Sequence, residues 1–378
     1  MYNIAGYAAM IHDAGRIAAF QRAIQLAVKP GSIVADIGTG LGIFAFLACQ
    51  AGARKVYAIE PSNVIVLAKE MAAANGFQDR IEFIAEFSTS VNLPEQVDVI
   101  VSDLSGAVPI FQHNLTAIRD ARTRFLKPHG ILIPQSDTVW TAVVSTPETH
   151  AVLAPPVDQS LGLNMQLAWK MATNRIGNVK ITSDQLVTAP QILVIVDYYL
   201  VEDSSVYIRL KWDVSCPAIA HGISLWFERT LVDGVYFSTA PGTPKTIYGE
   251  LFLPWPEPVP LEIGDIICAE IRADLVGDEY IWSWNTEVSK GTAVSASFRQ
   301  SEFLGEPLSP DPLRKQATRH VPRLNEEGEC KRLTLELMDG SRDLEEIARA
   351  VQESFVDRFR DLNAAITYVG KLARNCSV

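Results

Sequence analysis

The chain has 378 residues, of which 48% are hydrophobic and 20% charged, the balance of a soluble globular protein with two or three domains. Its formal net charge of −11 argues against a nucleic-acid partner, because binding a phosphate backbone requires a cationic surface. No apolar run reaches the length of a membrane span, and the most apolar stretch, QILVIVDYYLV, is interrupted by Asp197.

The N-terminal segment and the cysteines both predict a cytoplasmic protein. His12, Asp13 and Arg16 lie inside the most apolar part of the N-terminus, which makes that segment a poor signal peptide. The five cysteines are scattered without a close pair, so we expect reduced thiols and no zinc or other metal site. They are Cys49, Cys216, Cys268, Cys330 and Cys376.

Short apolar runs alternate with helical stretches from residue 30 to about residue 136. The runs SIVADIG, KVYAIE, RIEFIAE and VDVIVSDL are rich in Val and Ile, and helical patterns such as 44–50 and 63–75 lie between them. Strand–helix alternation of this kind predicts a parallel sheet with helices on both faces. We therefore assign residues 1–136, with their N-terminal helices, to an α/β domain of the Rossmann-like type.

The character of the sequence changes after residue 137. The run VYIRLKWDV alternates apolar and polar residues, and Pro- and Gly-rich turns separate it from similar runs. This pattern predicts an antiparallel β-domain over residues 137–303, either a sandwich or a barrel. After residue 310 the chain becomes polar and then helical again, which predicts a small third domain over residues 318–378.

The turn in ADIGTGLGIF points to a nucleotide-like ligand. Gly38, Gly40 and Gly42 end a strand and open a helix, where the backbone can approach a ligand closely and N–H groups are unpaired. Asp36 precedes the turn, and Glu60 ends the next strand, where its carboxylate can bind both hydroxyls of a ribose. The spacing differs from the G-x-G-x-x-G of dinucleotide folds. The pattern favours S-adenosylmethionine, which has a ribose but no pyrophosphate.

Several segments resemble protein arginine methyltransferases, in the order expected for that family. They are MIHDAGR, VADIGTGLGIFAFLACQAGARKVYAIEPS, LPEQVDVIVSDLSG, ARTRFLKPHGILIP and STAPGTPKTIY, and they span roughly residues 7–300. The resemblance implies a cofactor domain followed by a β-barrel, with the methyl acceptor bound between them. It also implies a dimerisation arm within residues 155–188, and hence a homodimer.

The resemblance assigns roles to individual residues. Arg16 should meet the carboxylate of the cofactor, Gly38 and Gly40 its methionine portion, and Glu60 its ribose. Phe87 and Ser88 should lie near the adenine. Three further residues should line the acceptor site, two of them on an N-terminal helix that closes over the pocket: Tyr7, Met10 and Tyr248.

The acceptor loop SDLSGAVPIFQHN departs from the family pattern. Asp103 and Gln112 stand where the family carries two glutamates that hold the guanidinium, and Ile247 replaces its histidine. Gln112 removes one charged contact, which typically contributes about 1.5–3 kcal/mol. Methyl transfer is still expected, with Asp103 orienting the acceptor. That acceptor is either a cationic nitrogen such as arginine or a hydroxyl, amide or carboxylate, for which His113 could serve as base.

The C-terminal segment resembles small winged-helix domains that bind leader segments of ribosomally made peptides. The similarity lies in a Leu-Asn start at 324–325, a helix ending at Asp339 and Gly340, and an acidic helix over 343–355. The leading interpretation is therefore a methyltransferase that acts on a peptide or protein. Two alternatives remain: a methyltransferase for a small metabolite or carboxylate, and an inactive scaffold that binds S-adenosylmethionine.

Overall fold

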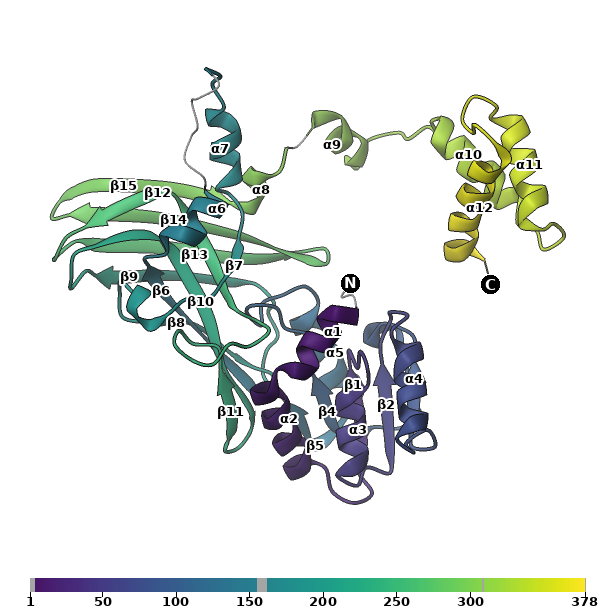
Figure 1. The fold of residues 1–378 in the computed structure, drawn as a ribbon, viewed down its shortest axis with the longest axis horizontal. Coiled ribbons are helices and arrows are strands. Elements are labelled where there is room, and N and C mark those ends of the chain that lie inside the picture. The colour runs from purple at the N-terminus through teal and green to yellow at the C-terminus, as the bar shows by residue number, and fades with distance from the viewer. Residues whose placement is uncertain (1–3, 155–161, 308, 378) are drawn as a thin grey trace. The chain divides into compact units, whose positions relative to one another are not determined.

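The computed structural model describes residues 4–154, 162–307 and 309–377. The chain forms two compact units, residues 1–306 and residues 307–378 (Figure 1). The first unit holds a parallel sheet with its helices and two antiparallel sheets, whereas the second is helical. Within the described ranges, no helix is both long enough and apolar enough to cross a membrane.

The parallel sheet has the order β3-β2-β1-β4-β5, as strand–helix alternation predicts. Its central strand β1 alternates sides: Val34 packs under α2 and α3, whereas Ile33 and Ala35 pack on the other face with Leu115 of α5. Because all neighbouring strands in this sheet are parallel, their carboxyl ends and the turns that follow them lie at one edge. The elements are α1 Ile4–His12, α2 Ala14–Ala27, β1 Ile33–Ile37, α3 Ile43–Gln50, β2 Lys55–Ile59, α4 Ile65–Ala74, β3 Ile81–Ile84, a 3-10 turn Ser88–Ser90, β4 Val97–Ser102, α5 Asn114–Arg124 and β5 Leu126–Ile133.

Two antiparallel sheets follow, and they confirm the predicted β-domain. One has the order β7-β12-β10-β6-β8, with β11 paired to β10, and the other has the order β15-β14-β13-β9. Trp212, Trp255 and Trp284 lie in one hydrophobic core to which both sheets contribute. The strands are β6 Ser136–Val144, β7 Gly177–Val179, β8 Gln191–Asp197, β9 Val206–Asp213, β10 Ala218–Val232, β11 Val235–Ser238, β12 Glu250–Leu261, β13 Ile266–Val276, β14 Glu279–Lys290 and β15 Ala293–Ser301.

Helix α2 connects the parallel sheet to the antiparallel part. Its Phe20 stacks on Phe44 of α3, with ring centroids 4.4 Å apart, and also contacts Phe237 of β11. Because α2 is fixed on both sides, Arg16 in its first turn is held at the edge of the sheet where the strands end.

A short helical excursion interrupts the antiparallel sheets. It contains α6 Pro147–Leu153 and α7 Gln166–Ala172, and a short helix α8 Glu302–Gly305 contacts α7. In Figure 1, α7 projects from the sheets, and none of its residues is buried. The predicted arm therefore coincides with a projecting element, although part of it, residues 155–161, lies outside the described residues.

The C-terminal unit is a bundle of helices with its own core. Asp343 caps α11 in a capping box with Glu346, and Asp361 caps α12. Ile347, Val351 and Val369 are buried together, which confirms the predicted helical domain. Residues 309–377 contain no strand, so this described range lacks the paired strands of a wing. The helices are α9 Pro310–Gln316, α10 Glu326–Leu337, α11 Leu344–Ser354 and α12 Leu362–Cys376.

Candidate functional site

The glycine turn after β1 packs closely against its neighbours because Gly38 and Gly40 have no side chain. Gly38 and Gly40 have φ angles of 73° and 53°, a region that L side chains rarely adopt. A Cβ atom at Gly38 would lie 2.4 Å from Leu104, and one at Gly40 would lie 2.9 Å from the ring of Tyr7. The backbone of this turn therefore passes directly beneath α1 and beside the acceptor loop.

The carboxylates of Glu60 and Asp36 hold the turn in place with hydrogen bonds. The carboxylate of Glu60 accepts hydrogen bonds from the backbone N–H of Gly40 at 3.1 Å and of Ser62 at 2.9 Å. One oxygen of Asp36 accepts from the hydroxyl of Thr39 at 2.5 Å and from the N–H of Ala45 at 3.0 Å. Its other oxygen, Oδ1, is buried and has no hydrogen-bond partner.

Burial changes the chemistry of Asp36. The side chain is 1% exposed, and burial raises its pKa to about 7, partly offset by the two hydrogen bonds. The carboxylates of Glu60 and Asp103 act in the same direction as burial. A cationic group placed in the turn would reverse this effect, and the cofactor predicted from the sequence carries an ammonium and a sulfonium.

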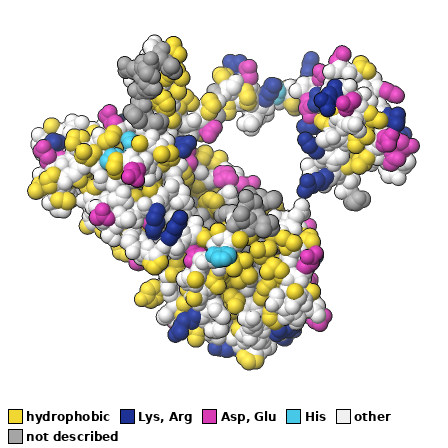
Figure 2. Space-filling view, in the orientation of Figure 1, with side chains coloured by type: hydrophobic (Ala, Val, Ile, Leu, Met, Phe, Trp, Pro, Cys, Tyr) yellow, Lys and Arg dark blue, Asp and Glu magenta, His cyan; other side chains and the backbone are white. Residues whose placement is uncertain are grey.

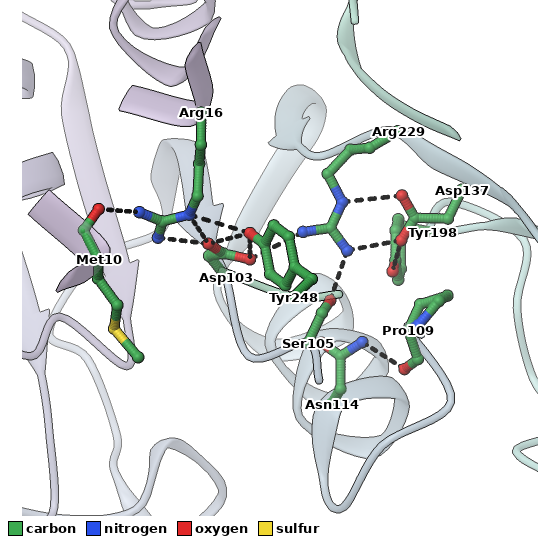
Figure 3. Close-up of polar contacts among 10 residues, drawn as sticks. All are labelled: Met10, Arg16, Asp103, Ser105, Pro109, Asn114, Asp137, Tyr198, Arg229 and Tyr248. Carbon is green, nitrogen blue, oxygen red and sulfur yellow. Dashed lines mark hydrogen bonds and ion pairs between the residues drawn. The ribbon is translucent and has the colours of Figure 1, made fainter. Parts of the chain in front are cut away.

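Arg16 lies next to the acceptor loop and contacts Asp103 (Figure 3). Its guanidinium donates to Oδ2 of Asp103 at 2.7 and 2.5 Å, to the hydroxyl of Tyr248 at 3.0 Å and to the carbonyl of Met10 at 3.2 Å. Tyr248 in turn donates its hydroxyl to Asp103. The structure therefore brings together four residues predicted for the cofactor and acceptor sites.

A second arginine, Arg229 of β10, completes this network and was not predicted. It donates to Oδ1 of Asp103 at 2.8 Å and forms a two-pronged ion pair with Asp137, at 2.8 and 2.7 Å. It also donates to the hydroxyl of Ser105. Tyr198 donates its hydroxyl to Asp137 at 2.5 Å. Arg229 is only 1% exposed, so its guanidinium group is shielded from water.

The network holds Asp103 in its ionised form. Burial opposes ionisation of Asp103, but Arg16 and Arg229 outweigh it and keep the pKa of this carboxyl below its usual value. Burial, followed by the negative charge of Asp103, raises the pKa of Tyr248 well above its ordinary value. The lowered pKa of Asp103 favours its anion and the raised pKa of Tyr248 favours its neutral hydroxyl, so neither is suited to act as a general base.

Gln112 and His113 lie elsewhere on the loop and do not join Asp103. Gln112 is exposed, and its amide donates to Glu279 at the start of β14, at 3.4 Å. His113 precedes α5, with Nδ1 3.7 Å from a carboxylate oxygen of Asp278 and its ring 6.1 Å from that of Phe87. Gln112 therefore faces Glu279 of β14, whereas Asp103 faces Arg16, Arg229 and Tyr248.

The remaining predicted residues lie on α1 and in the segment after β3. Tyr7 lies over Gly40, and Met10 contributes its backbone carbonyl to Arg16. Phe87 is 57% exposed, whereas Ser88 is buried and its carbonyl accepts from Arg124 at 2.7 Å. No cluster of three or more side chains suited to hold a metal ion occurs among the described residues.

Comparisons with known proteins find similar sequences and a similar fold. The family model for ribosomal protein L11 methyltransferase (PrmA) matches residues 18–144. Probable protein arginine N-methyltransferase 6 of Arabidopsis thaliana is 31% identical over 228 residues, which are 58% of this chain and 52% of that protein. The chain thus spans about half the length of that relative. Arginine N(omega)-methyltransferase of Streptomyces achromogenes subsp. streptozoticus is 28% identical over 275 residues, 70% of this chain and 74% of that protein.

A solved structure extends the likeness to the fold. The Trypanosoma brucei PRMT1 enzyme–prozyme heterotetrameric complex with AdoHcy has a TM-score of 0.71 and 22% identity, and the match covers 78% of this chain and 96% of that one. Because the match covers 78% of this chain, it includes parts of both the parallel sheet and the antiparallel sheets. In sequence and in fold, the chain is therefore similar to protein arginine N-methyltransferases.

Proposed function

We propose that this chain is an S-adenosylmethionine-dependent methyltransferase that methylates arginine side chains of peptides or proteins. The observation that carries the proposal is the glycine turn: Gly40 passes beneath Tyr7, Glu60 holds the turn, and Arg16 lies buried beside it. These residues fit the cofactor, because a glycine backbone allows a ligand to approach closely and the buried Oδ1 of Asp36 is without a partner. The similarity to arginine methyltransferases supports the acceptor.

The chain's own residues bind and orient the reactants. Glu60 would hold the ribose, Arg16 the carboxylate of the methionine portion, and Phe87 and Ser88 would flank the adenine. S-adenosylmethionine supplies a methyl group bonded to a sulfonium, which transfers to a nucleophile with little acid–base assistance. Positioning of the acceptor nitrogen in line with that bond therefore supplies most of the rate. Asp103, ionised and fixed by three donors, orients the acceptor.

Mass spectrometry of methylated peptides tests this function. Incubation of a peptide mixture with the protein and isotopically labelled S-adenosylmethionine should place the label on arginine nitrogens. Label on a hydroxyl or carboxylate would reject arginine as acceptor while leaving the cofactor assignment intact. If the protein does not bind S-adenosylhomocysteine in calorimetry, both the arginine acceptor and the cofactor assignment are wrong.

The C-terminal unit provides a place for a peptide substrate to dock. Its support is a separate core and the similarity to leader-binding domains in residues 324–355. A substrate held there has a high effective concentration at the acceptor site. Deletion of residues 318–378 should raise KM for a full-length peptide substrate much more than it lowers kcat. Equal kinetics with and without this segment would show that it does not dock the substrate.

The projecting arm provides a dimer contact. Leu163, Met165 and Leu167 are 59%, 44% and 73% exposed, and Figure 2 shows hydrophobic side chains along this projection. Such a group of apolar side chains is typical of an interface. Light scattering at micromolar concentration should give the mass of a homodimer, and Leu167→Asp should shift it toward a monomer. A wild-type monomer would reject the dimer.

A further inference from the structure

The carboxylate of Asp103 is already shared among groups of the chain itself. Oδ1 accepts from Arg229 at 2.8 Å and from the hydroxyl of Tyr248 at 2.8 Å. Oδ2 accepts from Arg16, at 2.7 and 2.5 Å, and again from Tyr248. An acceptor guanidinium that approaches Asp103 therefore meets an anion whose charge is divided between two internal guanidinium groups.

Of these two partners, Arg229 is the fixed one. Arg16 is expected to contact the cofactor carboxylate, so its share of Asp103 changes when the cofactor binds. Arg229 has no such alternative, because Asp137 holds it with two hydrogen bonds and Tyr198 fixes Asp137. Asp137 is 0% exposed, and leaving it unpaired in the interior would be strongly unfavourable.

The rest of the acceptor loop has no second carboxylate that could offset the positive charge of Arg229. Gln112 is neutral, and its amide is turned toward Glu279. A substrate guanidinium thus competes with Arg229, a like charge, for a single carboxylate in a dry site where charge interactions are strong. Arginine by itself should bind weakly here.

We propose that Arg229 is a specificity-determining residue: it weakens the acceptor site for an isolated arginine, so that substrate selection depends on contacts made outside that site. This inference rests on the proposed arginine acceptor. It explains why a substrate would need a second point of attachment. It also gives the strand β10 a part in acceptor choice, in addition to the part that the loop plays through its acidic residue.

Binding of a minimal arginine peptide to the protein saturated with S-adenosylhomocysteine tests the proposal. The probe is acetyl-Gly-Gly-Arg-Gly-Gly-amide, titrated by calorimetry. The double variant Arg229→Gln with Asp137→Asn removes one positive and one negative buried charge together, so neither partner is left uncompensated. It should bind the peptide about tenfold more tightly, the size of one charge-assisted contact. Arg229→Lys, which keeps the positive charge, should stay close to the wild type.

Two controls separate this effect from damage to the fold. Arg209→Gln removes an arginine that is paired to Glu270 on the exposed face of β9, and it should leave peptide affinity unchanged. The affinity of every variant for S-adenosylhomocysteine reports whether the proposed cofactor site at the glycine turn is intact. If the double variant binds the peptide no more tightly than the wild type, or if Arg229→Lys gains affinity equally, the proposal is wrong.

Failure of this inference and failure of the proposed function give different results. A protein that binds S-adenosylhomocysteine but methylates no arginine peptide contradicts the proposed acceptor, whatever the binding series shows. Conversely, a protein that methylates arginine, but whose peptide affinity does not respond to loss of the Arg229 charge, contradicts only the role of Arg229.

Discussion

The glycine turn and the acceptor loop lie at the same edge of the parallel sheet, but they hold their polar groups in different ways. In the turn, the partners are near in sequence: Thr39 binds Asp36 three residues away, and Gly40 binds Glu60 twenty residues away. In the loop, Asp103 is held by Arg16, Arg229 and Tyr248, which are 87, 126 and 145 residues distant. The conformation of the turn is therefore held by local hydrogen bonds, whereas the position of Asp103 in the loop depends on residues of the β-domain.

This difference predicts where substitutions should act. Changes in the turn should act first on cofactor binding, because the hydrogen-bond partners of Asp36 and Glu60 lie in one strand–helix–strand unit. Changes in the loop network should affect the stability of both halves of the first unit. Each prediction below tests whether substitutions in the turn and in the loop network have different effects.

The largest effect is expected from Gly40→Val. Its side chain would enter the space in front of the ring of Tyr7, at a backbone angle that disfavours it, and overpacking of this kind costs about 3 kcal/mol. Affinity for S-adenosylhomocysteine in calorimetry should fall by about a hundredfold. Gly15→Ala in α2 is the matched control, because nothing lies within 4 Å of its added Cβ atom. Equal affinities for Gly40→Val and wild type would place the cofactor elsewhere.

Glu60→Ala should weaken the same affinity by about 2–3 kcal/mol, because it removes the expected ribose partner and releases the N–H groups of Gly40 and Ser62. The control is Glu82→Ala on β3, whose carboxylate is exposed and forms an ion pair with Lys55 at the surface. If both variants lose the same affinity, Glu60 is not a cofactor residue.

Residue spacing explains why the turn could be predicted from the sequence and the loop network could not. Gly38, Gly40 and Glu60 follow a strand–helix–strand pattern whose geometry is nearly fixed, so their meeting point follows from their order. Asp103 could be placed on its loop for the same reason. Its partner Arg229 has a weaker signal: it lies in phase with the inward Phe227 and Leu231 of β10, a position where an unpaired arginine would be unfavourable. Which acids it meets depends on long-range packing.

Tyr198→Phe should lower the free energy of unfolding by about 1–2 kcal/mol, because it removes a hydrogen bond to the buried carboxylate of Asp137. Tyr236→Phe on β11 is the control, since that side chain is 75% exposed. Urea unfolding measures both. Affinity for S-adenosylhomocysteine should change in neither variant; a loss in Tyr198→Phe would show that the two regions are coupled.

The smallest effect is a pH dependence from Asp36. Because burial raises the pKa of Asp36 to about 7, the folded protein retains a proton that the unfolded chain releases. This stabilisation is complete at acidic pH below the unfolded pKa and is lost as the pH rises through about 7. Between about pH 6 and pH 8, the wild type should lose about 1 kcal/mol relative to Asp36→Asn.

The control for this measurement is Asp79→Asn, because Asp79 is exposed in the turn before β3. Its stability should follow the wild type across the pH range. Parallel curves for the wild type and Asp36→Asn would show that Asp36 does not exchange a proton in this range.

The chain of charges Arg16–Asp103–Arg229–Asp137 also has a consequence for unfolding. It links α2, the loop after β4, the strand β10 and the start of β6, so the buried charge of Asp103 depends on partners from both halves of the first unit. If the antiparallel sheets detached while the parallel sheet stayed folded, Asp103 and Arg16 would lose their neighbour, and Arg229 would leave with Asp137. Partial unfolding is thereby penalised, and residues 1–306 should melt in a single calorimetric transition.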